Sequence, residues 1–173
     1  MKNIAVIGTG VIGTGWILRF LANDIKVKAF DKNNQQINFL KEEIRRTNLI
    51  IKKLYNTKIN IKNLEIVENI EEAVKNADLI QENVPERLIL KKDVINNISK
   101  YSPSNSIIAS SSSGLLPSDL QLKCINPKRL IIAHPFNPVY ILPLVEIVKG
   151  KKTTNLYLNK AKKFYQKIKM KTL

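Results

Sequence analysis

Two residues in the second half of the chain carry the side chains needed to take a proton from an alcohol. His134 is the chain's one histidine and stands directly before the rigid segment 135–138, Pro-Phe-Asn-Pro. Imidazole suits proton transfer because its ordinary pKa lies near neutrality. Glu146 lies twelve residues further on, within the apolar run 142–148, where a carboxylate needs a partner. We expect His134 to be a base that Glu146 orients; the alternatives are a core histidine and an exposed glutamate.

A second group of residues, near the start of the chain, could bind a dinucleotide. Gly8, Gly10 and Gly13 form a G-x-G-x-x-G pattern between a strand-like apolar run and a helical pattern. Glycines at these positions allow a tight turn and let the backbone approach a pyrophosphate. The first amides of the helix, at Val11 and Ile12, would then face the phosphates. We therefore expect a dinucleotide-binding turn here.

Asp31 points to the identity of the dinucleotide. It lies eighteen residues after Gly13, at the end of the second predicted strand. A carboxylate there accepts hydrogen bonds from the ribose hydroxyls and repels a 2′-phosphate, so the predicted cofactor is NAD rather than NADP. The alternative is that the glycines only form a tight turn and that Asp31 caps a loop.

Serines at a third position could contact a substrate or a cofactor. Residues 110–113 are all serines, Gly114 follows them, and together they end another predicted strand. Their hydroxyls could hold the substrate oxygen or the nicotinamide carboxamide, although a serine-rich turn is the simpler alternative. We expect no metal site and no internal disulfide, because Cys124 is the one cysteine and a buried or inert thiol is its expected state.

These residues must be positioned by alternating strands and helices. The pattern predicts an α/β, Rossmann-like doubly wound fold with a mostly parallel sheet, which brings strand ends and ligands to one edge. The helix 33–55 is expected to carry Ile37, Leu40, Ile44 and Leu49 on one face. The predicted strands are 2–7, 25–30, 64–67, 78–82, 106–110, 130–134 and 144–148. The predicted helices are 16–21, 33–55, 70–76, 86–99, 117–120 and 153–169.

Composition restricts the remaining possibilities. The 173 residues, 44% of them hydrophobic, are enough for one buried domain, which we place at 1–173. No run of eighteen apolar residues occurs, so we expect neither a membrane span nor a signal peptide, and a cytoplasmic location. We attribute the net charge of +15 to a general lysine bias and expect no nucleic-acid or membrane partner. Nucleic-acid binding through the lysine-rich segment 149–171 is the alternative.

Four segments together resemble the L-3-hydroxyacyl-CoA dehydrogenase family, in the family's order and spacing, over residues 3 to about 150. They are 6–13 (VIGTGVIG), 81–86 (QENVPE), 110–115 (SSSSGL) and 134–138 (HPFNP). The resemblance implies that His134 is the base, that Glu146 is its partner and that Ser113 contacts the substrate hydroxyl and the nicotinamide. It further implies NAD contacts at Glu86, Lys91, Ser113 and Asn137, the last beside the reacting centre.

Within this family the chain is most similar to the carnitine 3-dehydrogenase branch, and next to the lambda-crystallin or L-gulonate 3-dehydrogenase branch. Pro135 after the histidine, where acyl-CoA members more usually carry Phe, favours a small free hydroxy acid. The resemblance thus implies NAD-dependent oxidation of the 3-hydroxyl of a short acid of the L-carnitine type. The alternatives are a 3-hydroxyacyl-CoA, L-gulonate, or a truncated non-catalytic NAD-binding module. Family members close the pocket and dimerise through a helical C-terminal domain that these residues lack.

Overall fold

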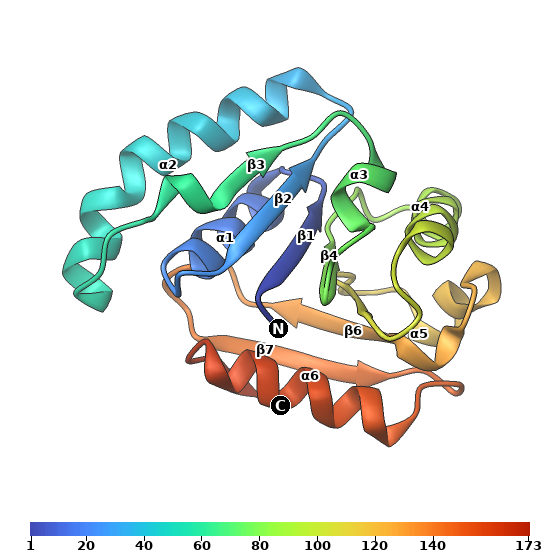
Figure 1. The fold of residues 1–173 in the computed structure, drawn as a ribbon. Coiled ribbons are helices and arrows are strands. Elements are labelled where there is room, and N and C mark those ends of the chain that lie inside the picture. Colours follow the sequence, from blue (N-terminus) through green and yellow to red (C-terminus); the bar gives the residue numbers. More distant parts are fainter.

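A computed structural model describes residues 1–173, apart from the side chain of Tyr55. Within the described chain, eight strands form one sheet in the order β3-β2-β1-β4-β5-β6-β7-β8 (Figure 1). The strands are β1 (Asn3–Ile7), β2 (Lys26–Phe30), β3 (Leu64–Ile66), β4 (Leu79–Glu82), β5 (Ile107–Ser110), β6 (Leu130–Pro135), β7 (Leu144–Lys149) and β8 (Lys171–Thr172). The helices are α1 (Val11–Leu21), α2 (Asn34–Tyr55), α3 (Ile70–Val74), α4 (Leu88–Tyr101), α5 (Pro117–Leu120) and α6 (Asn155–Lys167).

The sheet is parallel from β3 to β6, and β7 runs antiparallel to β6. The strand order reverses beside β1, because β2 and β3 lie on one side of it and β4 and β5 on the other. Ligands of open α/β sheets bind at such a switch point, beyond the carboxyl ends of the strands. The Rossmann-like, mostly parallel architecture predicted from the sequence is confirmed.

The central strands β1, β4, β5 and β6 are largely buried on both faces because helices cover both faces. In β1, Ile4 and Val6 face the cluster that α1, α2 and α6 cover, whereas Ala5 and Ile7 face the cluster under α3, α4 and α5. Cys124 is buried in the second cluster, and burial raises the pKa of its thiol. The expectation of a buried cysteine is therefore confirmed.

Aromatic side chains join α6 to α1 across the first face of the sheet. The rings of Trp16 and Phe20 stack at 5.4 Å, and Tyr165 lies 5.3 Å from Trp16. Phe164 lies 6.1 Å from Phe20. These contacts fix the last helix of the chain against the helix that begins at the glycine turn.

Several details differ from the sequence prediction. The bounds of three helices shift, because α1 begins at Val11 rather than at residue 16, α3 ends at Val74 rather than at 76, and α4 is Leu88–Tyr101 rather than 86–99. In α2, Ile37, Leu40 and Ile44 are buried as expected, but Leu49 is 71% exposed and Ile51 takes the core position. Ile51 lies two full turns beyond Ile44 and returns to the same face. The last helix ends at Lys167, not at residue 169, and the two-residue strand β8 then pairs with β7. In the described residues, no helix is long and apolar enough to cross a membrane.

Candidate active site

The glycine turn joins β1 to α1 at the switch point of the sheet. Gly8 has a φ of +90°, a conformation that favours glycine, and its N–H donates to the carbonyl of Phe30 at 2.8 Å. Gly10 is the N-cap of α1 and has no side chain to satisfy the first amides of the helix. Those amides, at Val11 and Ile12, are donors for an anion.

The space around the glycines fits a pyrophosphate. A Cβ on Gly13 would lie 1.9 Å from the carbonyl oxygen of Gly8, so α1 can pack on the turn only without a side chain there. A Cβ on Gly8 would lie 2.8 Å from the backbone of Asn83. At Gly10 the nearest atom is the side-chain oxygen of Gln36, at 3.6 Å, so this position leaves room on the outer side of the turn. Two glycines serve packing and the third leaves space for a ligand.

Asp31 is held beside the turn directly after β2. Its Oδ2 accepts a hydrogen bond from the backbone N–H of Thr9 at 2.7 Å, and its Oδ1 accepts one from Asn33 at 2.9 Å. Each carboxylate oxygen can accept further bonds, so the fixed carboxylate can also receive ribose hydroxyls. Its negative charge disfavours an additional phosphate. The glycine turn and Asp31, the first half of the candidate site, therefore fit NAD.

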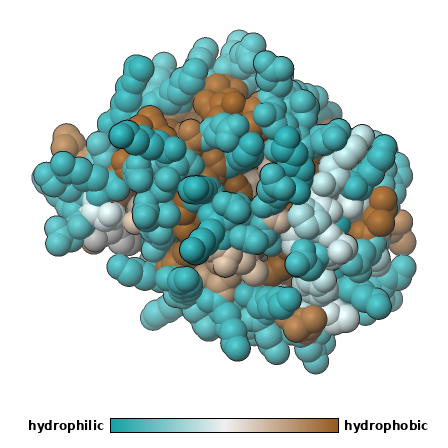
Figure 2. All heavy atoms as spheres, in the orientation of Figure 1, coloured by the Kyte–Doolittle hydropathy of each residue, from teal (hydrophilic) through white to brown (hydrophobic). Residues whose placement is uncertain are grey.

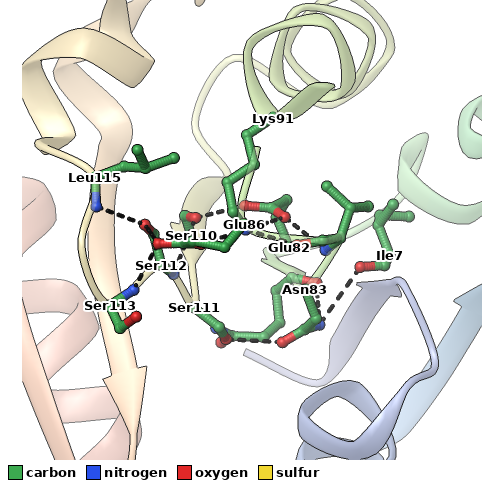
Figure 3. Close-up of polar contacts among 12 residues, drawn as sticks. Ile7, Glu82, Asn83, Glu86, Lys91, Ser110, Ser111, Ser112, Ser113 and Leu115 are labelled. Atoms are coloured by element: carbon green, nitrogen blue, oxygen red, sulfur yellow. Dashed lines mark hydrogen bonds and ion pairs between the residues drawn. The ribbon is translucent and has the colours of Figure 1, made fainter. Parts of the chain in front are cut away.

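Glu86 organises the serine loop that follows β5 (Figure 3). One of its oxygens accepts the backbone N–H groups of Ser113 and Gly114, each at 3.0 Å, and also the hydroxyl of Ser112. Partial burial alone would raise the pKa of the Glu86 carboxyl. The bonds from Ser112, Gly114 and Ser113 and the charge of Lys91 outweigh it and lower that pKa. A charged Glu86 thus fixes the backbone of Ser113.

A buried ion pair between Lys91 and Glu82 lies next to Glu86. The ammonium of Lys91 donates to Glu82 at 2.8 Å and to the carbonyl of Val84 at 2.9 Å, and it lies 3.5 Å from Glu86. Lys91 is 1% exposed and Glu82 is fully buried. The second oxygen of Glu82 accepts the hydroxyl of Ser110. The ammonium of Lys91 is therefore directed inward, onto carboxylates.

His134 and Glu146 face each other across the antiparallel pair β6–β7. They are register partners, and His134 Nδ1 lies 2.8 Å from Glu146 Oε2. The carboxylate favours the tautomer with the proton on Nδ1, which leaves Nε2 able to accept a proton. The side chains are 29% and 43% exposed, respectively, so the pair is open to solvent.

The carboxyl edge of the sheet brings the second half of the site together. Ser110, at the end of β5, pairs with Ile132 in β6, two residues before His134. The serine loop and His134 therefore extend from neighbouring strands past the same edge. The loop after His134 contains exposed Asn137, whose bond to Pro138 is cis.

The structure thus gathers the predicted residues along one edge of the sheet. The glycine turn follows β1, Asp31 follows β2 and the serine loop follows β5, whereas the His134–Glu146 pair joins the end of β6 to the start of β7. Sequence reasoning gave no role to Glu82, although a glutamate at the end of an apolar strand is a signal of a buried ion pair. In the described residues, no cluster of side chains suited to a metal ion occurs.

Comparison with known proteins places this arrangement among dehydrogenases. Residues 3–173 match the model of the 3-hydroxyacyl-CoA dehydrogenase, NAD binding domain. The chain is 48% identical to the L-carnitine dehydrogenase of Oceanobacillus iheyensis, over all of this chain and 57% of that protein. It is 46% identical to the L-carnitine dehydrogenase of Bacillus cereus, over all of this chain and 53% of that protein. The chain therefore spans about half the length of these relatives.

Solved structures share the fold. An NAD⁺-dependent 5-formyl-3-hydroxy-2-methylpyridine 4-carboxylic acid 5-dehydrogenase superposes with a TM-score of 0.93 at 27% identity, over all of this chain and 57% of that one. The 3-hydroxybutyryl-CoA dehydrogenase of Escherichia coli superposes with a TM-score of 0.91 at 22% identity, over 99% of this chain and 37% of that one. The second likeness bears on the fold alone.

Proposed function

We propose, because this chain belongs to the family of the 3-hydroxyacyl-CoA dehydrogenase NAD-binding domain, that its protein oxidises the 3-hydroxyl of a short hydroxy acid of the L-carnitine type. The observation that carries the proposal is the His134–Glu146 pair, 2.8 Å apart, at the sheet edge that also holds the dinucleotide turn. The similarity to two L-carnitine dehydrogenases at 48% and 46% identity supports the choice of substrate.

The first half of the site would hold NAD, which supplies the acceptor for a hydride when it is bound. The amides of Val11 and Ile12 would bind the pyrophosphate, and Asp31 the ribose hydroxyls of the adenosine. Asn137 and the loop that Glu86 fixes, with Ser113, would line the nicotinamide side. Lys91 would act through Glu86, since its ammonium contacts that carboxylate and is itself buried. The turn itself is built by Gly8, Gly10 and Gly13.

The second half of the site would move the proton. Nε2 of His134 takes the proton of the substrate hydroxyl, and the hydroxyl of Ser113 donates a hydrogen bond to the same oxygen. Glu146 keeps the other ring proton on Nδ1 and stabilises the imidazolium that forms, because its carboxylate lies 2.8 Å away. Asp31 and Glu146 thus serve different steps, binding and proton transfer.

A second domain would complete the pocket. His134 is 29% exposed in this chain, and hydride transfer needs a site from which water is excluded. We propose that a helical domain of the kind that the family resemblance implies would cover this edge and form the dimer contact. The location of the protein is proposed to be the cytoplasm, as expected from its sequence.

The test is a comparison of substrates and variants. NADH formation by the purified wild-type protein and by His134→Ala is measured with L-carnitine, L-gulonate and 3-hydroxybutyryl-CoA, alongside an NAD titration of both. We expect turnover on L-carnitine, and we expect His134→Ala to lower kcat by about 10²–10⁴-fold while NAD still binds. Turnover on the thioester in place of L-carnitine would overturn the substrate assignment. Full activity of His134→Ala would overturn the assignment of the base.

A further inference from the structure

A partly buried hydrogen-bond network connects α6 to Ile7, the residue before the glycine turn. Ser111 is its centre: its hydroxyl lies 3.1 Å from Trp16 Nε1, 2.9 Å from Gln81 Nε2 and 2.7 Å from Asn83 Oδ1. Tyr165 in α6 donates to Gln81 Oε1 at 2.6 Å. Figure 3 shows the last links, from Ser111 to Asn83 and from Asn83 to the turn. None of these contacts belongs to the proton or hydride chemistry described above.

The directions of the bonds follow from groups that can only donate or only accept. The indole of Trp16 can only donate, so Ser111 must accept from it. The carbonyl of Ala133 can only accept, and Gln81 Nε2 lies 3.5 Å from it, so the amino group of Gln81 also faces Ser111. With both lone pairs occupied, the Ser111 proton is donated to Asn83 Oδ1. The hydrogen-bonding capacity of the Ser111 hydroxyl is then fully used.

The network ends on the backbone that supports the dinucleotide turn. Asn83 Nδ2 donates to the carbonyl of Gln81 at 3.0 Å and to that of Ile7 at 3.5 Å. Ile7 directly precedes Gly8, and the backbone of Asn83 lies so close to Gly8 that a Cβ would approach it to 2.8 Å. The orientation of the Asn83 amide therefore fixes the backbone that packs against Gly8.

We propose that Ser111 is a positioning residue for NAD, and that Tyr165 of α6 acts on the glycine turn through Gln81, Ser111 and Asn83. This inference rests on the NAD-binding function proposed above. Trp16, Gln81 and Tyr165 are fully buried, whereas Ser111 and Asn83 are half-buried, so a polar atom of the first three that lost its partner would stay unsatisfied at a cost in free energy. Burial also raises the pKa of Tyr165, which keeps its phenol protonated and able to donate.

Two variants test the network at its centre and at its far end. Ser111→Ala removes the partner of three side chains, and we expect the Kd for NAD to rise roughly tenfold. Tyr165→Phe removes one buried hydroxyl on the opposite side of Gln81, and we expect a rise of about three- to tenfold. Ser111→Thr keeps the hydroxyl and should restore the affinity to within about twofold.

The matched control is Tyr157→Phe. It makes the same change in the same helix, but the Tyr157 hydroxyl bonds to the carbonyl of Ser104, outside the network. Its Kd should stay within about twofold of the wild type. Emission from Trp16, the chain's one tryptophan, gives an independent signal and should shift to shorter wavelength in Ser111→Ala, where the indole N–H loses its acceptor.

For each variant of the full chain, calorimetric titration measures the Kd for NAD, and a melting curve recorded without NAD measures stability. The two measurements together separate an effect on positioning from an effect on stability. Unchanged Kd values in Ser111→Ala and Tyr165→Phe, with or without lower melting temperatures, would overturn the inference and leave a purely structural network. A weakened Ser111→Ala beside an unaffected Tyr165→Phe would overturn the connection to α6. A wild-type chain that does not bind NAD would overturn the proposed function, and the inference with it.

Discussion

At the scale of single residues, the candidate site pairs each functional side chain with one that fixes its state. Glu146 sets the tautomer of His134, and Thr9 and Asn33 hold the two oxygens of Asp31. Glu86 orders the amides of Ser113 and Gly114. Fixed geometry of this kind matters because small displacements of reacting groups reduce rates strongly.

Glu86 gives a prediction about pH. Its folded pKa lies below the ordinary value, so its contribution to stability is present above the unfolded pKa of about 4.3 and is lost as pH falls through the lower folded pKa. At pH 7, Glu86→Gln should lower the free energy of unfolding by about 1 kcal/mol. We assign this small value because its side chain is 40% exposed.

Urea denaturation of the wild type and of Glu86→Gln at several pH values checks this prediction. The difference in unfolding free energy should shrink as the pH falls below the unfolded pKa of about 4.3 and through the lower folded pKa, because the wild-type carboxyl then also becomes neutral. A difference that grew toward low pH would contradict the assigned direction. Glu71→Gln is a suitable control, because Glu71 is an exposed helix residue outside the loop network.

The sequence predicted the paired residues better than it predicted their supports. His134 and Glu146 were found because a lone histidine and a glutamate in an apolar run are conspicuous, and a strand pair brings such residues opposite each other. The supports of Ser113 could not be derived in this way. They depend on which oxygen of Glu82 or Glu86 meets Lys91 of α4, and the spacing of residues carries no signal for the orientation of such side chains.

At the scale of elements, the strand–turn–helix unit β1–α1 decides whether a dinucleotide can bind. Its glycines have different tasks. A side chain at Gly13 would collide with backbone, since its Cβ would lie 1.9 Å from the Gly8 oxygen. A side chain at Gly10 meets only the flexible Gln36, at 3.6 Å, and projects where a ligand would lie.

These differences predict two distinct outcomes. Gly13→Ala should lower the free energy of unfolding by about 2–4 kcal/mol and also abolish NAD binding, because the turn must move. Gly10→Ala should change the free energy of unfolding by less than about 1 kcal/mol, yet raise the Kd for NAD by at least about tenfold. Chemical denaturation and NAD titration of both proteins measure the two quantities.

Gly114→Ala serves as the control for these substitutions. Its Cβ would meet no described atom within 4 Å, so the free energy of unfolding should stay near the wild-type value. Because Gly114 belongs to the loop proposed to line the nicotinamide side, this variant is a control for stability alone. Equal loss of stability in Gly10→Ala and Gly13→Ala would contradict the division of roles. Unchanged NAD affinity in Gly10→Ala would show that a ligand does not approach that position.

The sequence located the strands and helices that have long apolar patterns. It missed the short strand β8 and misplaced the lysine-rich end of α6. The central strands β1, β5 and β6 are nearly continuous apolar runs, and the sequence located them. Strands β2 and β3, which alternate apolar with charged residues, were located as well. Strand β8 has only two residues, Lys171 and Thr172, and forms because β7 offers it an edge. The end of α6 was missed because the left-handed residue there is Lys169 rather than a glycine.

At the scale of the whole molecule, the fold accounts for the position of much of the positive charge. Helix α6 buries Ala161, Phe164 and Tyr165 against the sheet and turns its lysines outward. Hydrophilic side chains cover most of the face seen in Figure 2, including the region of α6. An amphipathic helix with a lysine-rich outer face needs no anionic partner to explain its sequence.

The openness of the site leads to the last prediction. His134 and Glu146 are 29% and 43% exposed, and the 173 residues span 57% of the L-carnitine dehydrogenase of Oceanobacillus iheyensis. The proposed contacts to NAD come mainly from the glycine turn and Asp31, which this chain holds in place by itself. Hydride transfer also needs a substrate fixed against the base and shielded from water. Binding and turnover should therefore separate in this chain.

We expect residues 1–173 alone to bind NAD but to oxidise L-carnitine with a kcat/KM at least about 100-fold below that of the longer relative assayed beside it. Calorimetry measures the first quantity and NADH absorbance the second. His134→Ala should leave the Kd for NAD unchanged and remove the residual turnover, which shows that any activity comes from this site. A chain that matched the relative's kcat/KM would mean that its own strand edge excludes water and orients the substrate, despite the exposure of both side chains.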